Sequence, residues 1–301
     1  MSTSTRIEES EFFRETTDPA LQESADRAKT ELLTYGELYE LWERQQWRTQ
    51  DIDFGQDRAD WLSFPEEERF QRMYGLSSFF IGEQKVTDEL GPIIAAVPTQ
   101  EMKIFLSTQV ADEARHVRFF DRFYAEVGVL DSDSLAGRLE ETSQHLNPAF
   151  GELFDGMLHA RVRRLGENPD DSEALVEAIT LYHMIIEGML ALTGQHFIID
   201  YNEREGVLPG FVQGFNLIAR DEHRHVAFGA RFLRDMARED EKHGQAIQRT
   251  MEEALPVADE VLAPPWVEDR ENFELFGVTM QDTRAFAMQA LTRRLKVIGL
   301  A

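Results

Sequence analysis

The chain has 301 residues, with 56 acidic side chains against 31 basic ones and a formal net charge of −25. Because binding to a phosphate backbone requires a basic face, this balance argues against nucleic acid as a partner. There is no cysteine, which excludes disulfides, thiolate metal sites and cysteine nucleophiles. We find neither a signal peptide nor an apolar run of the ~18–20 residues that span a bilayer, so we expect a cytoplasmic protein without a transmembrane segment.

The basic side chains are unevenly divided, since only five are lysine and 26 are arginine. A dense acidic surface with little lysine suits a cytoplasm of high salt, where screening relieves self-repulsion. We therefore hypothesise a halophilic source; the alternative is an ordinary acidic enzyme. In both cases the charge concerns solubility and not chemistry.

Nearly every long segment has helical periodicity, and no convincing strand pattern appears. The first helix is expected around 20–48. The sequence Ser63-Phe64-Pro65-Glu66 predicts a helix start, with Ser63 as the cap, and Gly91-Pro92 predicts the end of that helix. Further helices are predicted over about 99–128, 147–166, 171–200, 209–240, 243–262 and 280–297, with a break at Pro264-Pro265.

No low-complexity linker divides the chain. We therefore predict one all-α domain over residues 1–301, with a bundle core at about 63–240 and a flexible segment at 1–20.

One short sequence motif occurs twice, 109 residues apart. Residues 112–119 and 221–228 agree at six of eight positions, and each copy holds a Glu and a His three residues apart. On a helix this spacing places both side chains on one face. The two pairs are Glu113 with His116, and Glu222 with His225. A carboxylate and an imidazole presented together twice indicate a site for two metal ions.

Two further acids, Glu83 and Glu187, lie within strongly apolar helical stretches. A carboxylate buried there without a partner would be costly or protonated, and coordinating a cation removes that cost. Either acid alone would more simply be a buried ion pair. The order Glu, Glu-x-x-His, Glu, Glu-x-x-His is typical of ferritin-like dimetal-carboxylate four-helix bundles, here with additional flanking helices. The predicted metal ligands are Glu83, Glu113, His116, Glu187, Glu222 and His225.

Each copy of the motif begins with an aspartate, and we predict that these two aspartates form hydrogen bonds to the metal ligands from outside the site. Each accepts the N–H of a metal-bound histidine, most simply Asp221 from His116 and Asp112 from His225. The neighbouring Arg115 and Arg224 either pair with these acids or form outward salt bridges. Nothing assigns three other histidines as ligands, and we expect hydrogen-bonded or surface roles for His183, His196 and His223.

Four carboxylates and two imidazoles form an oxygen-rich ligand set, which suits Fe and Mn more than Cu or Zn. Four ionised carboxylates balance the charge of two divalent ions. A site of this kind activates dioxygen when open coordination positions remain.

With its ligands in this order, the chain resembles the ligand-binding oxidases that are homologous to the ribonucleotide reductase small subunit, over roughly residues 20–295. Members of that family have a Val three residues after the first Glu ligand and a Tyr five residues before the third acidic ligand. Val86 and Tyr182 stand at those places. Phe120 stands where tyrosyl-radical subunits place a Tyr, four residues after the first ligand His.

The resemblance implies a dioxygen-activating Mn/Fe oxidase whose Val86 and Tyr182 become joined by an ether bond. Mn would be held near Glu83, Glu113 and His116, and Fe near the other three ligands. It also implies a long-chain fatty acid whose carboxylate reaches the metals, and we expect a homodimer. Phe79, Phe80, Met184, Ile185 and Met189 could line a pocket for that ligand, although plain core packing is the favoured interpretation for any one of them.

Two alternative functions remain open. One is a tyrosine-free small subunit of ribonucleotide reductase, although the last Tyr of the chain is Tyr201 and a relay Tyr near the C-terminus is therefore missing. The other is a ferritin-like iron-binding protein without an organic substrate.

Overall fold

The computed structural model describes residues 13–14, 31–270 and 272–300. The first half of the chain comprises β1 (Phe13–Arg14), β2 (Glu31–Leu32), α2 (Tyr35–Arg44), the 3₁₀ turn η3 (Thr49–Asp51), α3 (Gly55–Ser63), α4 (Glu66–Ala96), α5 (Gln100–Val127) and α6 (Leu135–Ser143). There follow α7 (Pro148–Gly151), η4 (Glu152–Leu158), α8 (His159–Glu167), α9 (Ser172–Ile179), η5 (Thr180–Ala191), α10 (Leu192–Glu205), α11 (Pro209–Glu239), α12 (Glu241–Val261), β3 (Glu274–Leu275), β4 (Val278–Thr279) and α13 (Met280–Ile298).

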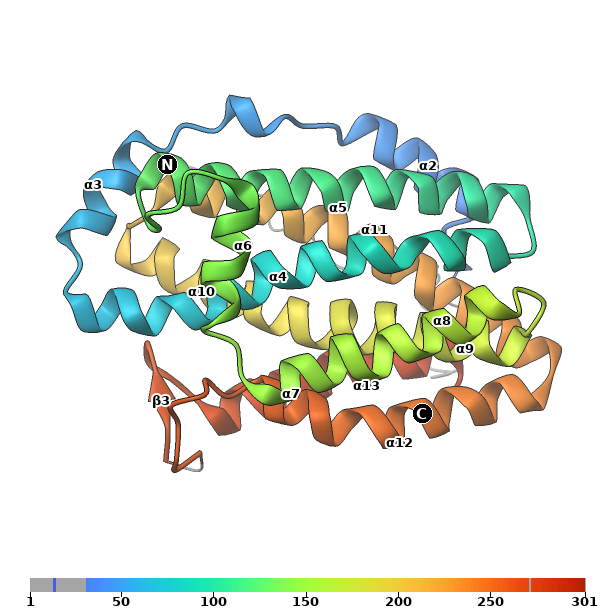
Figure 1. The fold of residues 1–301 in the computed structure, drawn as a ribbon. Helices are drawn as coiled ribbons and strands as arrows, with labels where there is room; N and C mark the ends of the chain where they lie inside the picture. The colour runs from blue at the N-terminus through green and yellow to red at the C-terminus, as the bar shows by residue number, and fades with distance from the viewer. Residues whose placement is uncertain (1–12, 15–30, 271, 301) are drawn as a thin grey trace, which may run out of the picture.

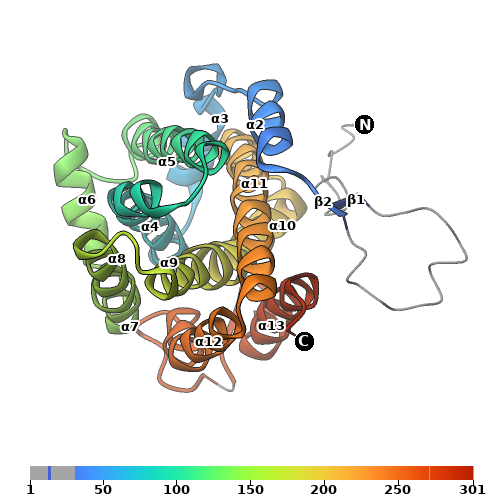
Figure 2. The same cartoon turned by 90° about the vertical axis from the view of Figure 1, so that its right-hand side faces the viewer.

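Four long rods form the bundle: α4, α5, the continuous rod α9–η5–α10, and α11 (Figure 1). Viewed along the rods, these four surround the middle of the molecule, while α12 and α13 cover one side and α2 and α3 the other (Figure 2). The predicted all-α class and four-helix bundle with flanking helices are thus confirmed.

Several helix boundaries follow directly from capping residues. The side chain of Thr99 accepts a hydrogen bond from the Met102 N–H at the start of α5, and Gly128 ends that helix at φ +78°. Asn147 caps α7 and Asp171 caps α9 in the same manner. Because these signals are local, the sequence placed these boundaries correctly.

The predicted limits of the helix at 63–91 were wrong at both ends. Ser63 ends α3, a helix that was not predicted, and α4 begins at Glu66 after Pro65, without a side-chain cap. At the other end α4 continues through Pro92 to Ala96. A Cβ at Gly166 of α8 would lie 3.8 Å from the Pro92 ring, so tertiary packing on this turn outweighs the usual breaking effect of proline.

The helix expected at 20–48 was also too long. Within the described part of that range, from residue 31 onward, the helix is α2, which starts from a capping box between Thr34 and Glu37; residues 20–30 lie outside the described residues. Two antiparallel pairs of two-residue strands, β1 with β2 and β3 with β4, were not predicted, nor was α6. The flexible segment expected at 1–20 lies, apart from residues 13 and 14, outside the described residues.

The rod Ser172–Glu205 is the one helix of the described residues that is long and apolar enough to cross a membrane. However, 78% of its apolar window is buried inside the protein, as in the core helix of a globular bundle. Its central part, η5, is a π-helix of 12 residues rather than the α-helix that the periodicity predicted. π-Helical turns are rare and occur frequently at functional sites.

The core consists of two apolar clusters, and the polar centre lies between them. On α5, Leu106 belongs to the first cluster and Phe119 to the second, with Glu113 and His116 between them in the chain. The second cluster is largely aromatic, as the ring contacts of Phe120 with Phe211 and Phe119 illustrate. The acidic residues along the rods are therefore enclosed by hydrocarbon on both sides.

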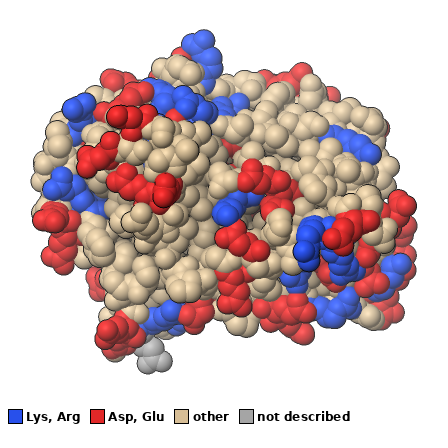
Figure 3. All heavy atoms as spheres, viewed as in Figure 1, with Lys and Arg blue, Asp and Glu red and all other residues tan. Residues whose placement is uncertain are grey.

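Acidic and basic side chains are interspersed over the face seen in Figure 3. Many of the basic groups are arginines that pair with nearby acids, such as Arg164 with Asp171 and Glu177.

Candidate dinuclear metal centre

The structure brings all six predicted ligands together in the middle of the bundle. Their donor atoms form two groups, each with atoms within 4.8 Å of one another. The first group is Glu83, Glu113, His116 and Glu222; the second is Glu113, Glu187, Glu222 and His225. Every member is buried. Glu113 and Glu222 belong to both groups, whereas the sequence had assigned each to one metal.

Each imidazole turns its Nδ1 toward three carboxylates. His116 Nδ1 lies 3.1 Å from Glu83 Oε2, 3.4 Å from Glu113 Oε2 and 3.3 Å from Glu222 Oε1. His225 Nδ1 lies 3.4 Å from Glu113 Oε1, 3.3 Å from Glu187 Oε1 and 3.7 Å from Glu222 Oε2. The two oxygens of Glu113 thus face different histidines, as do those of Glu222, which is the arrangement required to bridge two ions.

The donor atoms fit divalent cations. Four buried donor atoms of the six candidate ligands have no hydrogen-bond partner among the described residues, namely Glu113 Oε2, Glu187 Oε2, Glu222 Oε2 and His225 Nδ1. Buried polar atoms are rarely left in this state, and a bound ion would satisfy them.

The electrostatics of the centre lead to the same conclusion. Burial raises the pKa of Glu83 and Glu187 well above the usual range, and the neighbouring acids add to that rise. Burial also opposes ionisation of Glu113, but the adjacent imidazoles of His116 and His225 lower its pKa to about 2. The surrounding acids outweigh burial at His116 and His225 and raise the pKa of both. Without a cation the centre must therefore hold protons, which metal binding would displace.

The outer nitrogen of each histidine meets an aspartate from the opposite repeat. His116 Nε2 lies 3.3 Å from Asp221 Oδ2, and His225 Nε2 lies 3.2 Å from Asp112 Oδ2. These are the pairs expected from the sequence. They orient each ring so that Nδ1 faces the carboxylates.

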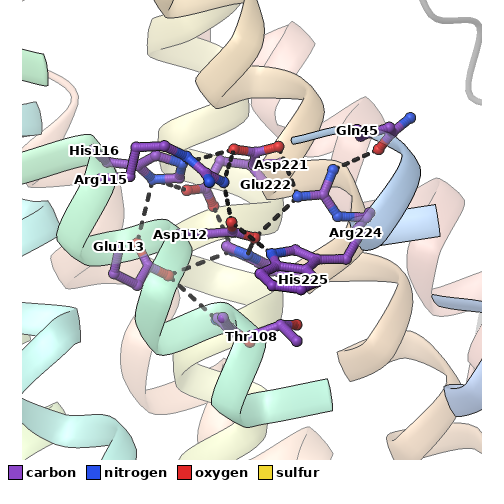
Figure 4. A network of polar contacts seen from close by, with 12 residues as sticks. Gln45, Thr108, Asp112, Glu113, Arg115, His116, Asp221, Glu222, Arg224 and His225 are labelled. Atoms are coloured by element: carbon purple, nitrogen blue, oxygen red, sulfur yellow. Dashed lines mark hydrogen bonds and ion pairs between the residues drawn. The ribbon is translucent and has the colours of Figure 1, made fainter. Parts of the chain in front are cut away.

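The two arginines of the repeats point inward rather than to solvent. Arg224 is fully buried, and its Nη2 donates to Asp112 Oδ2 at 2.9 Å and to Asp221 Oδ1 at 2.6 Å (Figure 4). Arg115 Nη2 donates to Asp221 Oδ2 at 3.0 Å and also contacts Asp112. The outward salt bridges considered as an alternative are therefore not formed.

Two tryptophans complete this outer layer, and the sequence analysis missed them. Trp42 Nε1 donates to Asp112 Oδ1 at 2.9 Å, and Trp47 Nε1 donates to Asp221 Oδ2 at 2.7 Å. They come from α2 and from the segment after it, which cross the bundle close to α5 and α11. The available signal was weak: two indoles, five residues apart, in an otherwise polar stretch.

Gln109 was also missed as a member of the centre, whereas His183 has the hydrogen-bonded role that was expected. Gln109 Nε2 donates to Glu187 Oε1 at 3.0 Å and to Glu113 Oε1 at 3.3 Å, and its Oε1 lies 3.1 Å from His183 Nε2. Burial lowers the pKa of His183 to about 3, so this ring is neutral. Neither residue belongs to the repeated motif, so the repeat gave no indication of it.

The other two histidines have the ordinary roles expected. The ring of His196 stacks on Phe286 with centroids 4.2 Å apart, and His223 Nδ1 lies near the backbone oxygen of Ala219. Neither belongs to the two groups of acids and imidazoles.

Tyr182 lies on η5, five residues before Glu187, and is fully buried. Its hydroxyl donates to Glu113 Oε1 at 3.1 Å. Burial and then the negative charge of Glu113 raise the pKa of Tyr182 well above its ordinary value, so the phenol is protonated. Val86 lies one helical turn after Glu83 and is 4% exposed.

An apolar pocket of about 250 Å³ opens from the acids toward one end of the bundle. Glu83, Val86, Glu187 and Glu222 line its inner end. The pocket runs between α4 and α10 as far as the β3–β4 hairpin, where Phe276 contributes to the wall. It can accept a long apolar molecule beside the carboxylates.

Of the five residues considered for the lining of this pocket, Phe79 lines it. The other four have the core packing that was favoured for each of them, namely Phe80, Met184, Ile185 and Met189. Two residues of the π-helix η5 that were not named from the sequence, Ile186 and Leu190, line the pocket.

The family model for the ribonucleotide reductase small chain matches residues 30–301. Solved structures of an R2-like ligand-binding oxidase are also similar. A Gly-to-Phe variant with anaerobically reconstituted Mn/Fe cofactor is 28% identical, with a TM-score of 0.76 over 89% of this chain and 95% of that chain. A Tyr-to-Phe variant, also with anaerobically reconstituted Mn/Fe cofactor, is 29% identical, with a TM-score of 0.77 over 89% and 94% of the two chains. On the match to most of its length, this chain belongs to the ribonucleotide reductase small-chain family.

Proposed function

We propose that this protein is a dioxygen-activating oxidase with one Mn and one Fe ion, and that it binds a long-chain fatty acid or a similar molecule. The observation that carries the proposal is the pair of buried ligand groups that share Glu113 and Glu222, placed beside Tyr182 and at the inner end of an apolar pocket. The Mn/Fe cofactor of the similar structures supports the choice of metals.

In this proposal Glu83 and His116 would hold Mn, Glu187 and His225 would hold Fe, and Glu113 and Glu222 would contribute to both positions. Asp221 and Asp112 keep the histidine rings in place. When bound, the metal pair supplies electrons and open coordination positions for dioxygen. The chain supplies an enclosed, water-poor chamber, because apolar clusters lie on both sides of the acids.

We further propose an ether bond between the Tyr182 oxygen and an aliphatic carbon of Val86. Forming it breaks one O–H and one C–H bond and removes two protons and two electrons. Dioxygen would accept these two electrons together with two that the metal pair would supply, and the two released protons with two more from solvent would complete its reduction to two waters. Glu113 accepts the hydrogen bond of the phenol and is therefore placed to receive its proton.

The fatty acid is proposed to lie with its carboxylate at the metals and its chain between α4 and α10. Glycines at positions 75, 82 and 194 line the pocket. A fatty acid would fit this pocket because the lining is apolar along its length and acidic only at the inner end, where a cation would neutralise the charge.

Intact mass tests the oxidase. After loading with Mn and Fe in air, the chain should be ~2 Da lighter than the apo chain, with the loss in peptides that contain Val86 and Tyr182. Tyr182→Phe should bind both metals without the loss. Tyr124→Phe, which alters another fully buried tyrosine, is the matched control and should keep it. An unchanged mass in the loaded wild-type chain contradicts the ether bond.

Extraction tests the ligand. Organic extraction of the purified protein should yield about one fatty acid per chain, and Ala191→Leu, which narrows the pocket, should reduce that yield while both metals remain. Recovery of no amphiphile from the wild-type protein, or equal yields from both proteins, contradicts the proposed ligand.

The family match favours one second candidate, a tyrosine-free small subunit of ribonucleotide reductase. Nucleotide reduction upon addition of a large catalytic subunit would establish that role. Assembly into a hollow shell of many subunits would instead indicate a ferritin-like iron-binding protein. We propose that the protein is cytoplasmic. We also propose that it is a homodimer, which light scattering of the purified protein would test.

A further inference from the structure

The two halves of the metal centre differ at the position four residues before the glutamates that they share. The repeat relates Asp112 to Asp221, Glu113 to Glu222 and His116 to His225 with a constant offset of 109 residues. The same offset relates Gln109 to Ile218. A buried amide therefore stands beside one group of ligands, and a buried hydrocarbon side chain occupies the equivalent place in the other half.

The amide of Gln109 is held in one orientation. Its nitrogen donates to Glu187 Oε1 at 3.0 Å and to Glu113 Oε1 at 3.3 Å. Because the amide nitrogen faces two acceptors, the amide oxygen must accept from His183 Nε2, 3.1 Å away. Gln109 and His183 are both fully buried, so no solvent competes for these contacts.

Both acids that receive this amide belong to the group around His225. Glu187 has its Oε1 occupied by Gln109 while its Oε2 has no partner, which leaves Oε2 available to a cation. In the other half, Ile218 is packed in the aromatic cluster, and no side-chain amide of the described residues donates to Glu83. The hydrogen bonds of Gln109 thus select one oxygen of Glu187 and hold that acid in place.

We propose that Gln109 is a positioning residue that makes the two metal positions unequal. It donates to Glu187 and to the Glu113 oxygen that faces His225, and so holds both acids in place around the position beside His225. No side-chain amide of the described residues does the same for Glu83 at the position beside His116. This inference rests on the proposed role of the six residues as metal ligands, and it explains how a nearly symmetric centre distinguishes two ions.

The test is Gln109→Met, which keeps the size of the side chain and removes its hydrogen bonds. Apo protein is titrated without oxygen with Mn(II) alone and Fe(II) alone. Crystals loaded with an equal mixture are then measured at the Mn and Fe absorption edges for the occupancy of each position. We expect a 10–100-fold loss of affinity beside His225, little loss beside His116, and a less strict separation of the two metals.

Gln195→Met is the matched control, because Gln195 is an equally buried glutamine that belongs to neither ligand group. It should leave both affinities unchanged. The reciprocal Ile218→Gln should reduce the difference between the two positions. If Gln109→Met does not fold, His183→Leu removes the contact that fixes the amide and should produce a smaller loss at the same position.

Equal losses at both positions, or none at either, would overturn this inference. Those results leave the ligand assignment intact as long as the wild-type protein binds two metals at the six residues. Failure of the proposed function would appear differently, as a wild-type protein with no metal at these residues.

Discussion

Replacing Arg224 with methionine removes a fully buried cation that joins two buried aspartates. Arg224 donates to Asp112 and Asp221 at 2.9 and 2.6 Å, and these acids are 1% and 0% exposed. Removing one partner of a buried ion pair typically costs 3–5 kcal/mol, because a charge is left without compensation. Arg115 still contacts both acids, so we expect a loss near the lower end, about 3 kcal/mol.

Urea unfolding of the metal-free protein in a chelator measures this loss. Arg224→Lys should fall between the wild type and Arg224→Met, because an ammonium group cannot match the two-sided geometry of the guanidinium. In a double-mutant cycle with Asp112→Asn, the Arg224→Met loss should shrink by about 1–3 kcal/mol. A loss below about 1 kcal/mol for Arg224→Met would show that Arg115 and the tryptophans satisfy the aspartates by themselves, and would refute the reasoning.

Three further predictions concern stability. Burial lowers the pKa of His183 to about 3 in the folded protein, whereas the same side chain titrates near 6.5 in the unfolded chain. Its neutral form therefore costs the folded protein no stability above pH 6.5. As the pH falls toward 3, the free energy of unfolding should decrease, by roughly 3 kcal/mol at pH 4. In His183→Leu, the free energy of unfolding measured in urea should fall less between pH 7 and pH 4 than it does in the wild type. An unaltered pH dependence would contradict the assignment. Gly229→Ala should destabilise the protein by about 1–3 kcal/mol, because the added Cβ would lie 2.3 Å from the His183 Cβ. Gly91→Ala, where a Cβ would have no neighbour within 4 Å, should stabilise it by about 0.5–1 kcal/mol. Similar effects at both sites would be inconsistent with this packing. With 56 acidic against 31 basic side chains, the melting temperature should rise from low to molar KCl, and no gain would remove the halophilic hypothesis.

The sequence predicted best what depends on local signals and on repetition. Helix starts at Thr99 and Asp171 follow from one side chain and the backbone three residues ahead, so they could be assigned without tertiary information. The six acids and histidines were found because the repeat and the apolar setting of Glu83 and Glu187 mark them. The structure adds that two of the glutamates face both histidines.

What the sequence missed depends on contacts between distant segments. Trp42 and Trp47 reach aspartates that are 70 and 174 residues away, and Gln109 meets Glu187 across 78 residues. The π-helical form of η5 was also missed, because α-helical periodicity carries no information about it. The extension of α4 through Pro92 likewise depends on packing against α8.

The central claim is that one Mn and one Fe ion share the chamber formed by Glu83, Glu113, His116, Glu187, Glu222 and His225, next to a bond between Val86 and Tyr182. Diffraction from crystals of the aerobically loaded protein, measured at both metal absorption edges, tests it most directly. The account predicts two anomalous peaks within this chamber, Mn beside His116 and Fe beside His225, with continuous density between Val86 and Tyr182. An empty chamber after growth with both metals, or peaks only at the protein surface, would contradict it.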